Sequence, residues 1–394
     1  MTLSKKNIAL LGSTGSIGRS SIEVIEALAD RCRLVAATSH TNAGLLAQQA
    51  RRLHIPRVAL TNPALVDQLE NDLHGTDTEV LAGPEQLEAF ACDPDIDILI
   101  VAVVGAAALP AVLAAARAGK TIAIANKEAL VVAGSLVMPL AKKHNATILP
   151  VDSEHSAILQ AMHAGEPDEV EKIIITCSGG PFRDTPGKQL AHVSLQDALD
   201  HPTWSMGPKI TIDSASLMNK ALEIIEARWL FDLDADRIEV LIHPESIIHS
   251  LVEFRDGSVI AQLSEPDMKL PIQYALTYPQ RLPGPAKRLN MQQLGRLTFL
   301  PPDTERFPAL ALGFDVARRD GTAGAVFNAA NEAAVDAFRA EKIPFTGIAE
   351  LVGDCLRKHE WIENPDLQQL LDADSWARQQ IAAHVNATSQ HART

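Results

Sequence analysis

The sequence predicts an α/β fold with an N-terminal parallel sheet, a central α+β domain and a C-terminal helical bundle. Up to about residue 150, short apolar runs rich in β-branched residues alternate with helical stretches, which is typical of a parallel sheet. After Val151 this alternation loosens, and beyond about residue 304 the pattern is helical. A chain of 394 residues is long enough for two or three domains.

The expected elements follow in chain order. Apolar runs predict strands of the first sheet at residues 8–11, 34–37, 58–60, 98–104, 121–125 and 148–151. The central part predicts a helix at 156–162, strands at 172–176, 239–242, 248–254 and 259–263, and a long helix at 214–231. Helices are expected at 307–319, 323–340, 345–359 and 374–385. The predicted domains are therefore 1–150, 151–277 and 304–394, with a proline-rich linker at 278–303.

Composition and charge exclude several classes of protein. The chain carries 49 acidic and 35 basic residues, and this negative field repels phosphate backbones and anionic lipid surfaces. We therefore expect no nucleic-acid partner and no membrane association. Gly105 and Pro110 divide the uncharged stretch 98–116, which favours a strand and a packed helix over a membrane span. The four scattered cysteines predict neither disulfides nor a zinc site, and we expect a cytoplasmic protein.

A glycine run follows the first predicted strand directly. Gly12, Gly15 and Gly18 stand between that strand and a predicted helix. This order is typical of a Rossmann-like dinucleotide-binding turn, in which the backbone amides of residues 14–17 face a pyrophosphate. The spacing differs from the commonest dinucleotide fingerprint, and the alternative is a tight turn with a purely structural role.

Two strand ends carry further candidates for cofactor binding. Residues 38–42, after the second strand, contain Ser39 and His40 but no acid, which favours NADP(H) over NAD(H), unless these are simply loop residues. After the strand at 121–125 come Asn126 and Lys127, where Asn126 would touch the cofactor and Lys127 would act as an acid/base or an orienting cation. The alternative is a helix start with a solvated lysine.

Two carboxylates follow the last strand of the first sheet. In an extended chain, Asp152 and Glu154 point to one side, and paired carboxylates suit Mg²⁺ or Mn²⁺. His155 would be either a supporting group beside the metal or an ordinary helix residue. The alternative for the pair is a helix N-cap with acids in the first turn.

The central region has the donor groups of a phosphate-monoester pocket. Hydroxyl, amide and ammonium groups are supplied by Ser178, Ser214, Asn219 and Lys220. Lys220 and Glu223 share a helix face and would hold substrate and metal side by side, or form an ordinary ion pair. Residues 201–207 include Trp204 and Met206 and predict a mobile lid, or a loop anchored on the core by Trp204.

Seven motifs together resemble one enzyme family. GSTGSIG, ANKEAL, PVDSEHSAI, SGGPFRDTP, HPTWSMGPKITIDSASLMNKALEIIEARWLF, IHPESIIHS and SEPDM span the chain in order. The chain is identified on these motifs as similar to the 1-deoxy-D-xylulose 5-phosphate reductoisomerase family. The resemblance implies NADPH, Mg²⁺ or Mn²⁺, a sugar-phosphate substrate, a homodimer formed through the central domain, and a rearrangement followed by hydride reduction in non-mevalonate isoprenoid biosynthesis.

The resemblance also implies roles for particular residues. The implied metal ligands are Asp152, Glu154 and Glu223, and the implied catalytic residues are Lys127, Glu154 and His201. The implied substrate-binding residues are Ser153, Glu154, Ser178, His201, Ser214, Asn219, Lys220 and Glu223. The implied cofactor-binding residues are Thr14, Gly15, Ser16, Ile17, Ser39, His40, Asn126, Glu128, Gly207 and Met268. Pro266 would lie near the nicotinamide and His249 would be a supporting residue. Ser39 and His40 stand where family members often place a Gly and a Lys or Asn.

Two rival functions remain open at this point. A semialdehyde-type NADP dehydrogenase would share the first sheet and would use Cys177 as a covalent nucleophile without a metal. A non-enzymatic nucleotide sensor could be built on the same fold. The sensor gives no account of the carboxylates at Asp152, Glu154 and Glu223.

Overall fold

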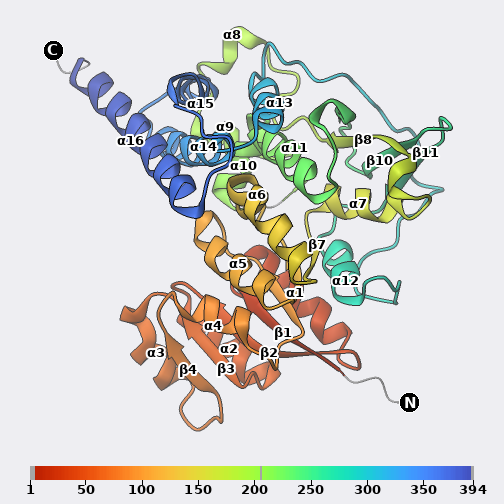
Figure 1. Cartoon of the computed structure of the whole chain (residues 1–394), viewed down its shortest axis with the longest axis vertical. Coiled ribbons are helices and arrows are strands. Elements are labelled where there is room, and N and C mark those ends of the chain that lie inside the picture. Colours follow the sequence, from red (N-terminus) through yellow and green to blue (C-terminus); the bar gives the residue numbers. More distant parts are fainter. Residues whose placement is uncertain (1–4, 205, 392–394) are drawn as a thin grey trace. The chain divides into compact units, whose positions relative to one another are not determined.

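The computed structural model of the chain describes residues 5–204 and 206–391 (Figure 1). The chain forms two compact units. Within the described residues, unit 1 comprises the chain up to Ala129, Val137–Ser156 and Asp267–Lys287. Unit 2 comprises Leu130–Leu136, Ala157–Pro266 and the chain from Arg288 onward. The domain ranges expected from the sequence stay predictions.

Unit 1 is built on a seven-stranded parallel sheet in the order β4-β3-β2-β1-β5-β6-β7. The strands are β1 (Lys6–Leu11), β2 (Cys32–Ser39), β3 (Arg57–Leu60), β4 (Glu79–Ala82), β5 (Ile98–Val101), β6 (Thr121–Ile124) and β7 (Thr147–Pro150). β1 and β5 form the sheet centre and are buried on both faces, so their apolar runs are continuous. This sheet confirms the predicted α/β fold class, although β4 was not among the expected strands.

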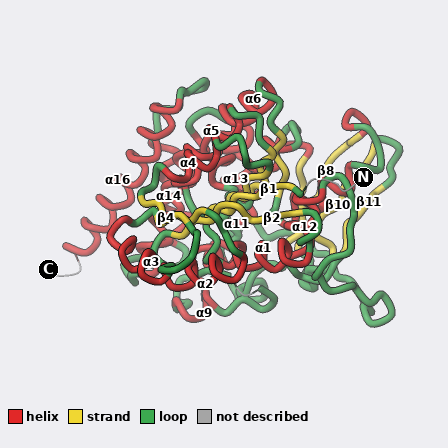
Figure 2. The backbone as a smooth tube through the Cα atoms, turned by 90° about the horizontal axis from the view of Figure 1, so that it is seen from below, coloured by secondary structure: helices red, strands yellow, loops and turns green. Residues whose placement is uncertain are grey.

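Helices cover both faces of this sheet. Figure 2 shows α4 (Gln86–Cys92) and α5 (Leu109–Arg117) on one face, and α1 (Ser16–Ala27), α2 (Ala43–Leu53) and α3 (Val66–Asp72) on the other. α6 (Glu128–Lys143) follows β6, and α12 (Lys269–Thr277) packs on α1, β6 and β7. β2, β3 and β4 follow one another on one side of β1, whereas β5, β6 and β7 follow one another on its other side. The strand order therefore reverses between β1 and β5. Ligands of such sheets bind at this reversal, outside the carboxyl ends of the strands.

Unit 2 contains a four-stranded mixed sheet in the order β11-β10-β8-β9. Its strands are β8 (Val170–Cys177), β9 (Ile238–Ile242), β10 (Ile248–Phe254) and β11 (Val259–Leu263). β8 pairs parallel to β9 and antiparallel to β10, and β10 pairs antiparallel to β11. β11 lies at the edge of the sheet, with Val259 and Ile260 exposed.

The helices of unit 2 form the C-terminal bundle and the elements it packs against. They are α7 (Ser153–Met162, beginning in unit 1), α8 (Gly187–Leu190), α9 (Leu195–Leu199), α10 (Pro208–Ala215), α11 (Met218–Leu230), α13 (Ala309–Arg319), α14 (Ala323–Arg339), α15 (Gly347–Lys358) and α16 (Leu367–His391). α14 packs on α15, α16 and α10, and α11 packs on α13 (Figure 1). No helix in the described part of the chain has the length and apolar character needed to span a bilayer.

The single long helix expected at 214–231 is wrong. The structure places two helices there, α10 and α11, separated at Ser216 and Leu217. Leu217 adopts a left-handed φ of 59°, and the Ser216 hydroxyl donates back to the carbonyl oxygens of Ile212 and Asp213. A serine hydroxyl that bonds its own helix competes with helix continuation, and the break follows directly. Ser214 therefore lies on α10, whereas Asn219, Lys220 and Glu223 lie on α11.

Candidate active site

The glycine turn after β1 has the shape of an anion-binding helix start. Gly12 has a φ of +86°, and a Cβ there would lie 2.6 Å from the Ala102 carbonyl oxygen. A Cβ at Gly18 would lie 2.3 Å from the Gly12 carbonyl oxygen, so only glycine lets α1 start this close to the turn. Gly15 is the N-cap of α1 and no side chain caps the helix. The first amides of α1 therefore remain for an anion.

Buried polar groups hold this turn in place. The Ser13 hydroxyl donates to Gln49 Oε1 at 2.7 Å, and Gln49 Nε2 donates back to the Ser13 carbonyl at 3.0 Å. Both residues are buried, which makes the pair a rigid link between the turn and α2. Sequence reasoning missed Gln49, because nothing local marks a glutamine whose partner lies 36 residues away.

Ser39 and His40 differ in solvent exposure. The Ser39 hydroxyl is buried, lies 2.8 Å from Thr14 Oγ1 and accepts from the Asn42 amide. His40 is exposed, and its Nδ1 lies 2.8 Å from Thr61 Oγ1. Ser39 thus links the glycine turn to the end of β2, whereas the His40 ring stands on the surface. Cofactor contacts for both residues stay predictions.

Asn126 joins the ends of β5 and β6. Its Nδ2 donates to the carbonyls of Val103 and Gly105 at 2.7 and 2.9 Å, and its Oδ1 accepts from the Ala129 amide. These three bonds fix the loop after β5 against the start of α6, which begins at Glu128. Both Asn126 and Glu128 are buried, and the structure gives Asn126 a clear role in shaping the edge of the sheet.

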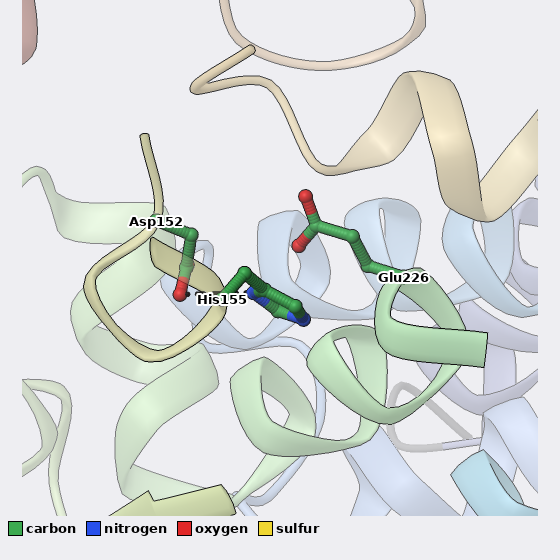
Figure 3. A group of neighbouring side chains, drawn as sticks. All are labelled: Asp152, His155 and Glu226. Atoms are coloured by element: carbon green, nitrogen blue, oxygen red, sulfur yellow. Dashed lines mark hydrogen bonds and ion pairs between the residues drawn. The ribbon is translucent and has the colours of Figure 1, made fainter. Parts of the chain in front are cut away.

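Lys127 and Asp152 bring the ends of β6 and β7 together. Lys127 Nζ lies 2.7 Å from Asp152 Oδ2, and both side chains are largely buried. Asp152 Oδ1 accepts from the Glu154 amide at 3.2 Å and lies 3.1 Å from Nδ1 of the fully buried His155. Figure 3 shows His155 beside Asp152 and draws Glu226 of α11, which belongs to unit 2. Lys127 is thus held at the carboxyl edge of a dinucleotide-type sheet.

The extended arrangement expected for Asp152 and Glu154 is wrong. α7 begins at Ser153, and the Asp152 carboxylate bonds the Glu154 amide, as a residue preceding a helix does. The helix also begins three residues earlier than the expected 156. Glu154 Oε2 accepts from the Ser153 hydroxyl at 2.6 Å. The two carboxylates remain at one helix start, so their chemistry as oxygen ligands is unchanged although the predicted geometry is not.

In unit 2, the loop after β8 meets the predicted lid. Ser178 Oγ lies 3.3 Å from His201 Nε2, and His201 Nδ1 accepts from the amides of Thr203 and Trp204. Because Nδ1 accepts, the proton of the neutral ring sits on Nε2 and points to Ser178. Burial lowers the pKa of His201, so the ring stays neutral around pH 7. Residue 205 of the predicted lid lies outside the described residues.

Ser214 lies close to the same loop. A Cβ at Gly180, where φ is +68°, would be 2.8 Å from the Ser214 carbonyl oxygen. Gly180 also donates its amide to Ser178 Oγ at 3.2 Å. The structure therefore brings the backbone that carries Ser178 against the end of α10 that carries Ser214.

The first two turns of α11 carry a compact polar group. Glu223 Oε1 accepts from Asn219 Nδ2 at 2.5 Å, and Glu223 Oε2 pairs with Lys220 Nζ. Lys220 and Glu223 form the helix ion pair that the local pattern allowed, and both side chains are buried. Sequence reasoning missed Glu226, one turn further on and equally buried, although its spacing from Glu223 was a usable signal.

The remaining predicted residues are more dispersed. His249 is buried and lies 2.9 Å from Ser264 Oγ. Met268 is the N-cap of α12 in unit 1, and Gly207 is the N-cap of α10 in unit 2. Pro266 is partly exposed near the end of a unit 2 segment. Cys177 ends β8 and is partly exposed.

The fold and these side chains define a class. A parallel sheet with a glycine turn at its reversal point, a buried lysine–aspartate pair at the same edge and a unit rich in phosphate donors belong to a dinucleotide-binding α/β enzyme.

Comparison with known proteins narrows this class. Family models match residues 8–134 ("1-deoxy-D-xylulose 5-phosphate reductoisomerase"), 148–231 ("1-deoxy-D-xylulose 5-phosphate reductoisomerase C-terminal domain") and 263–380 ("DXP reductoisomerase C-terminal domain"). The 1-deoxy-D-xylulose 5-phosphate reductoisomerase of Pelotomaculum thermopropionicum is 51% identical over 95% of this chain and 97% of its own length. That of Chloroherpeton thalassium is 46% identical over 98% of this chain and 100% of its own.

Solved structures agree with the sequence relatives. The enzyme from Zymomonas mobilis in complex with NADPH gives a TM-score of 0.91 at 42% identity, over 97% of this chain and 99% of that one. A reductoisomerase in complex with NADPH, fosmidomycin and magnesium gives 0.92 at 42% identity, over 98% and 99%. The chain belongs to the 1-deoxy-D-xylulose 5-phosphate reductoisomerase family. The resemblance drawn from the sequence motifs is confirmed.

Proposed function

We propose that the protein converts 1-deoxy-D-xylulose 5-phosphate to 2-C-methyl-D-erythritol 4-phosphate in non-mevalonate isoprenoid biosynthesis. The reaction depends on NADPH and a divalent metal and consists of a skeletal rearrangement followed by hydride reduction of the resulting aldehyde. The observation that carries this proposal is the buried Lys127–Asp152 pair at the carboxyl edge of a dinucleotide-type sheet, in a chain of this family. Family members with solved structures bind NADPH and magnesium.

The glycine turn suits NADPH. Its uncapped helix start offers the amides near Thr14, Gly15, Ser16 and Ile17 to the pyrophosphate. Ser39 and His40, with no acid beside them, would accept the 2′-phosphate that distinguishes NADPH from NADH. Asn126, Glu128, Gly207 and Met268 complete the cofactor residues of the proposal.

Asp152, Glu154 and Glu223 would hold the metal. All three offer carboxylate oxygens, the ligands that Mg²⁺ and Mn²⁺ prefer. In the structure these carboxylates contact Lys127, Lys220 and hydroxyl or amide donors. The ion, when bound, supplies a Lewis acid that polarises the substrate ketone. Magnesium is the metal named for a solved relative, and Mn²⁺ stays an alternative.

The chain's own residues bind the phosphate and handle protons. Ser178, Ser214, Asn219 and Lys220 would bind the phosphate group, and Ser153 and Glu154 the substrate hydroxyls. Lys127 Nζ, which donates to Asp152 Oδ2 at 2.7 Å, would donate a proton or a hydrogen bond to a developing oxyanion. His201 Nε2–H is a further donor beside Ser178.

The loop 201–207 would act as a lid. Trp204 and Met206 are both partly exposed, and apolar side chains in a closing loop exclude water from a reactive intermediate. Binding of the phosphate, which lies away from the reacting carbons, would supply free energy for closure.

The protein is further proposed to be a cytoplasmic homodimer. β11 is an edge strand with exposed Val259 and Ile260, and such an edge is a natural surface for pairing with a second copy. All four cysteines are free, in keeping with a reducing compartment.

The test is NADPH oxidation, followed by its absorbance, with 1-deoxy-D-xylulose 5-phosphate and Mg²⁺ or Mn²⁺. We expect oxidation that EDTA abolishes and added metal restores. Folded protein that shows no oxidation with either metal would overturn the proposal.

A matched variant separates this function from the semialdehyde dehydrogenase. Cys177→Ala should retain most of the activity, because the proposed reaction forms no thioester at that sulfur. Activity lost in this variant while NADPH still binds would favour the dehydrogenase. Turnover of any sugar phosphate by the unaltered protein would exclude a sensor as the whole function.

A further inference from the structure

α10 is tied to the C-terminal helices by a buried polar pair. Asn331 of α14 donates from Nδ2 to Asp213 Oδ1 of α10 at 3.0 Å, across 118 residues of sequence. Both side chains are almost completely buried, and most of the other buried residues of α14 are small or apolar, such as Ala330 and Ala334. Apolar side chains would join two helices without the cost of desolvating an aspartate. Packing therefore does not explain why these residues stand here.

Local helix stability does not explain them either. Asp213 Oδ2 lies 2.8 Å from Lys209 Nζ, one turn earlier in α10, but outside the direction of a hydrogen bond. A lysine in the first turn and an aspartate in the last turn are both at the wrong end of a helix for its dipole. A lysine four residues before an acid is also the weaker order of such a pair. The arrangement thus fixes α10 from outside, at some cost to the helix itself.

The position of α10 affects two parts of the proposed site. The N-cap of the helix is Gly207, where the proposed lid ends. The last turn of the helix carries Ser214, whose backbone lies against the Ser178–Gly180 loop. A shift of α10 would move the Ser214 hydroxyl and the base of the lid together. We propose that Asn331 is a positioning residue: through Asp213 it fixes α10, and with it Ser214 of the proposed phosphate pocket. This inference rests on the proposed function of that pocket.

The experiment compares Asn331→Ala with Asn328→Ala. Asn328 lies on the same helix and is equally buried, but its Nδ2 donates to Glu332 of its own helix and not to α10. Asn331→Ala should raise the KM for 1-deoxy-D-xylulose 5-phosphate about tenfold and weaken competitive inhibition by inorganic phosphate by a similar factor. Tenfold is about 1.4 kcal/mol, close to the lower end of the range for one hydrogen bond to a charged group, about 1.5–3 kcal/mol. The kcat should stay within about twofold, and Asn328→Ala should leave both phosphate readouts unchanged.

An exchange variant provides the rescue. Asn331→Asp alone would face two buried carboxylates and should raise the KM further. Combining it with Asp213→Asn restores a donor and an acceptor in reversed order, so the KM should fall back toward that of the unaltered protein. If the two substitutions only weakened the packing of the core independently, the KM of the double variant would be at least as high as that of either single variant.

Each outcome decides the inference. If Asn331→Ala matches Asn328→Ala in KM and in phosphate inhibition, Asn331 does not position the pocket. If Asn331→Ala fails to fold, Asp213→Ala, which removes the acceptor of the same hydrogen bond, carries the same comparison. If the unaltered protein shows no turnover, the proposed function fails on its own. Calorimetric titration with inorganic phosphate then still tests the anchor, and equal phosphate affinity in all variants overturns it.

Discussion

Replacing Gly18 by alanine should weaken NADPH binding. A Cβ at Gly18 would lie 2.3 Å from the Gly12 carbonyl oxygen and 2.5 Å from that of Ser13, and both contacts are with backbone. Ordinary contacts of this kind need about 3.5 Å, so the start of α1 must retreat by about 1 Å. Overpacking of this size costs about 1–3 kcal/mol, against a gain of up to ~1 kcal/mol in helix propensity.

The loss in cofactor affinity follows from the same displacement. Each amide that no longer reaches the pyrophosphate forfeits a hydrogen bond to a charged group, worth about 1.5–3 kcal/mol. The NADPH Kd should therefore rise by roughly ten- to a hundredfold. Fluorescence titration with NADPH measures this, and urea unfolding of the cofactor-free protein measures the cost in stability.

Gly44→Ala is the matched control for this prediction. Gly44 also lies in the first turn of a helix of unit 1, but a Cβ there meets nothing within 4 Å. This variant should gain up to about 1 kcal/mol of stability and keep its NADPH affinity. If Gly18→Ala binds NADPH as tightly as Gly44→Ala does, the close approach at the turn has no role in cofactor binding and the reasoning fails.

Three further predictions concern unit 2. Glu223→Gln should abolish metal-dependent turnover while NADPH titration stays normal; unchanged turnover would remove Glu223 from the metal ligands. Lys220→Ala should raise the KM for the sugar phosphate at least tenfold by removing a charge-assisted contact, and an effect confined to NADPH affinity would contradict its role. Because burial lowers the folded-state pKa of His201, its contribution to stability is complete above its unfolded value of about 6.5 and is lost as the pH falls through the folded value. Between pH 7 and pH 5, the free energy of unfolding should therefore fall more in the unaltered protein than in His201→Gln. Parallel curves of unfolding free energy against pH would refute this.

Local sequence patterns predict most of the parallel sheet correctly because its central strands are buried on both faces. β1 and β5 must be continuous apolar runs, and the glycines after β1 are required by backbone contacts within the same few residues. Features that depend on one backbone angle escape the same reasoning. The break before α11 rests on Leu217 in a left-handed conformation, which leucine itself does not signal.

The candidate site also contains residues that the sequence predicts and contacts that it does not. Residue types at strand ends predict the carboxylates and the lysine, since oxygen ligands and cations are recognisable one at a time. Their partners are less visible: Asp152 bonds Lys127 across 25 residues, and Gln49 bonds Ser13 across 36. The pairing of Asp213 with Asn331 crosses more than a quarter of the chain, so only the folded structure reveals it.

The interleaved path of the chain has a consequence for how the protein is made. Unit 1 is assembled from three separate stretches, and its last stretch, Asp267–Lys287, leaves the ribosome about 110 residues after Ser156. Until then α1, β6 and β7 lack the helix α12 that packs on them. α12 therefore packs on α1, β6 and β7 only after much of unit 2 has been synthesised. A fragment that stops at residue 150 would lack α12 and would expose the surface of α1, β6 and β7 on which that helix packs, so residues 1–150 do not form a complete structural unit.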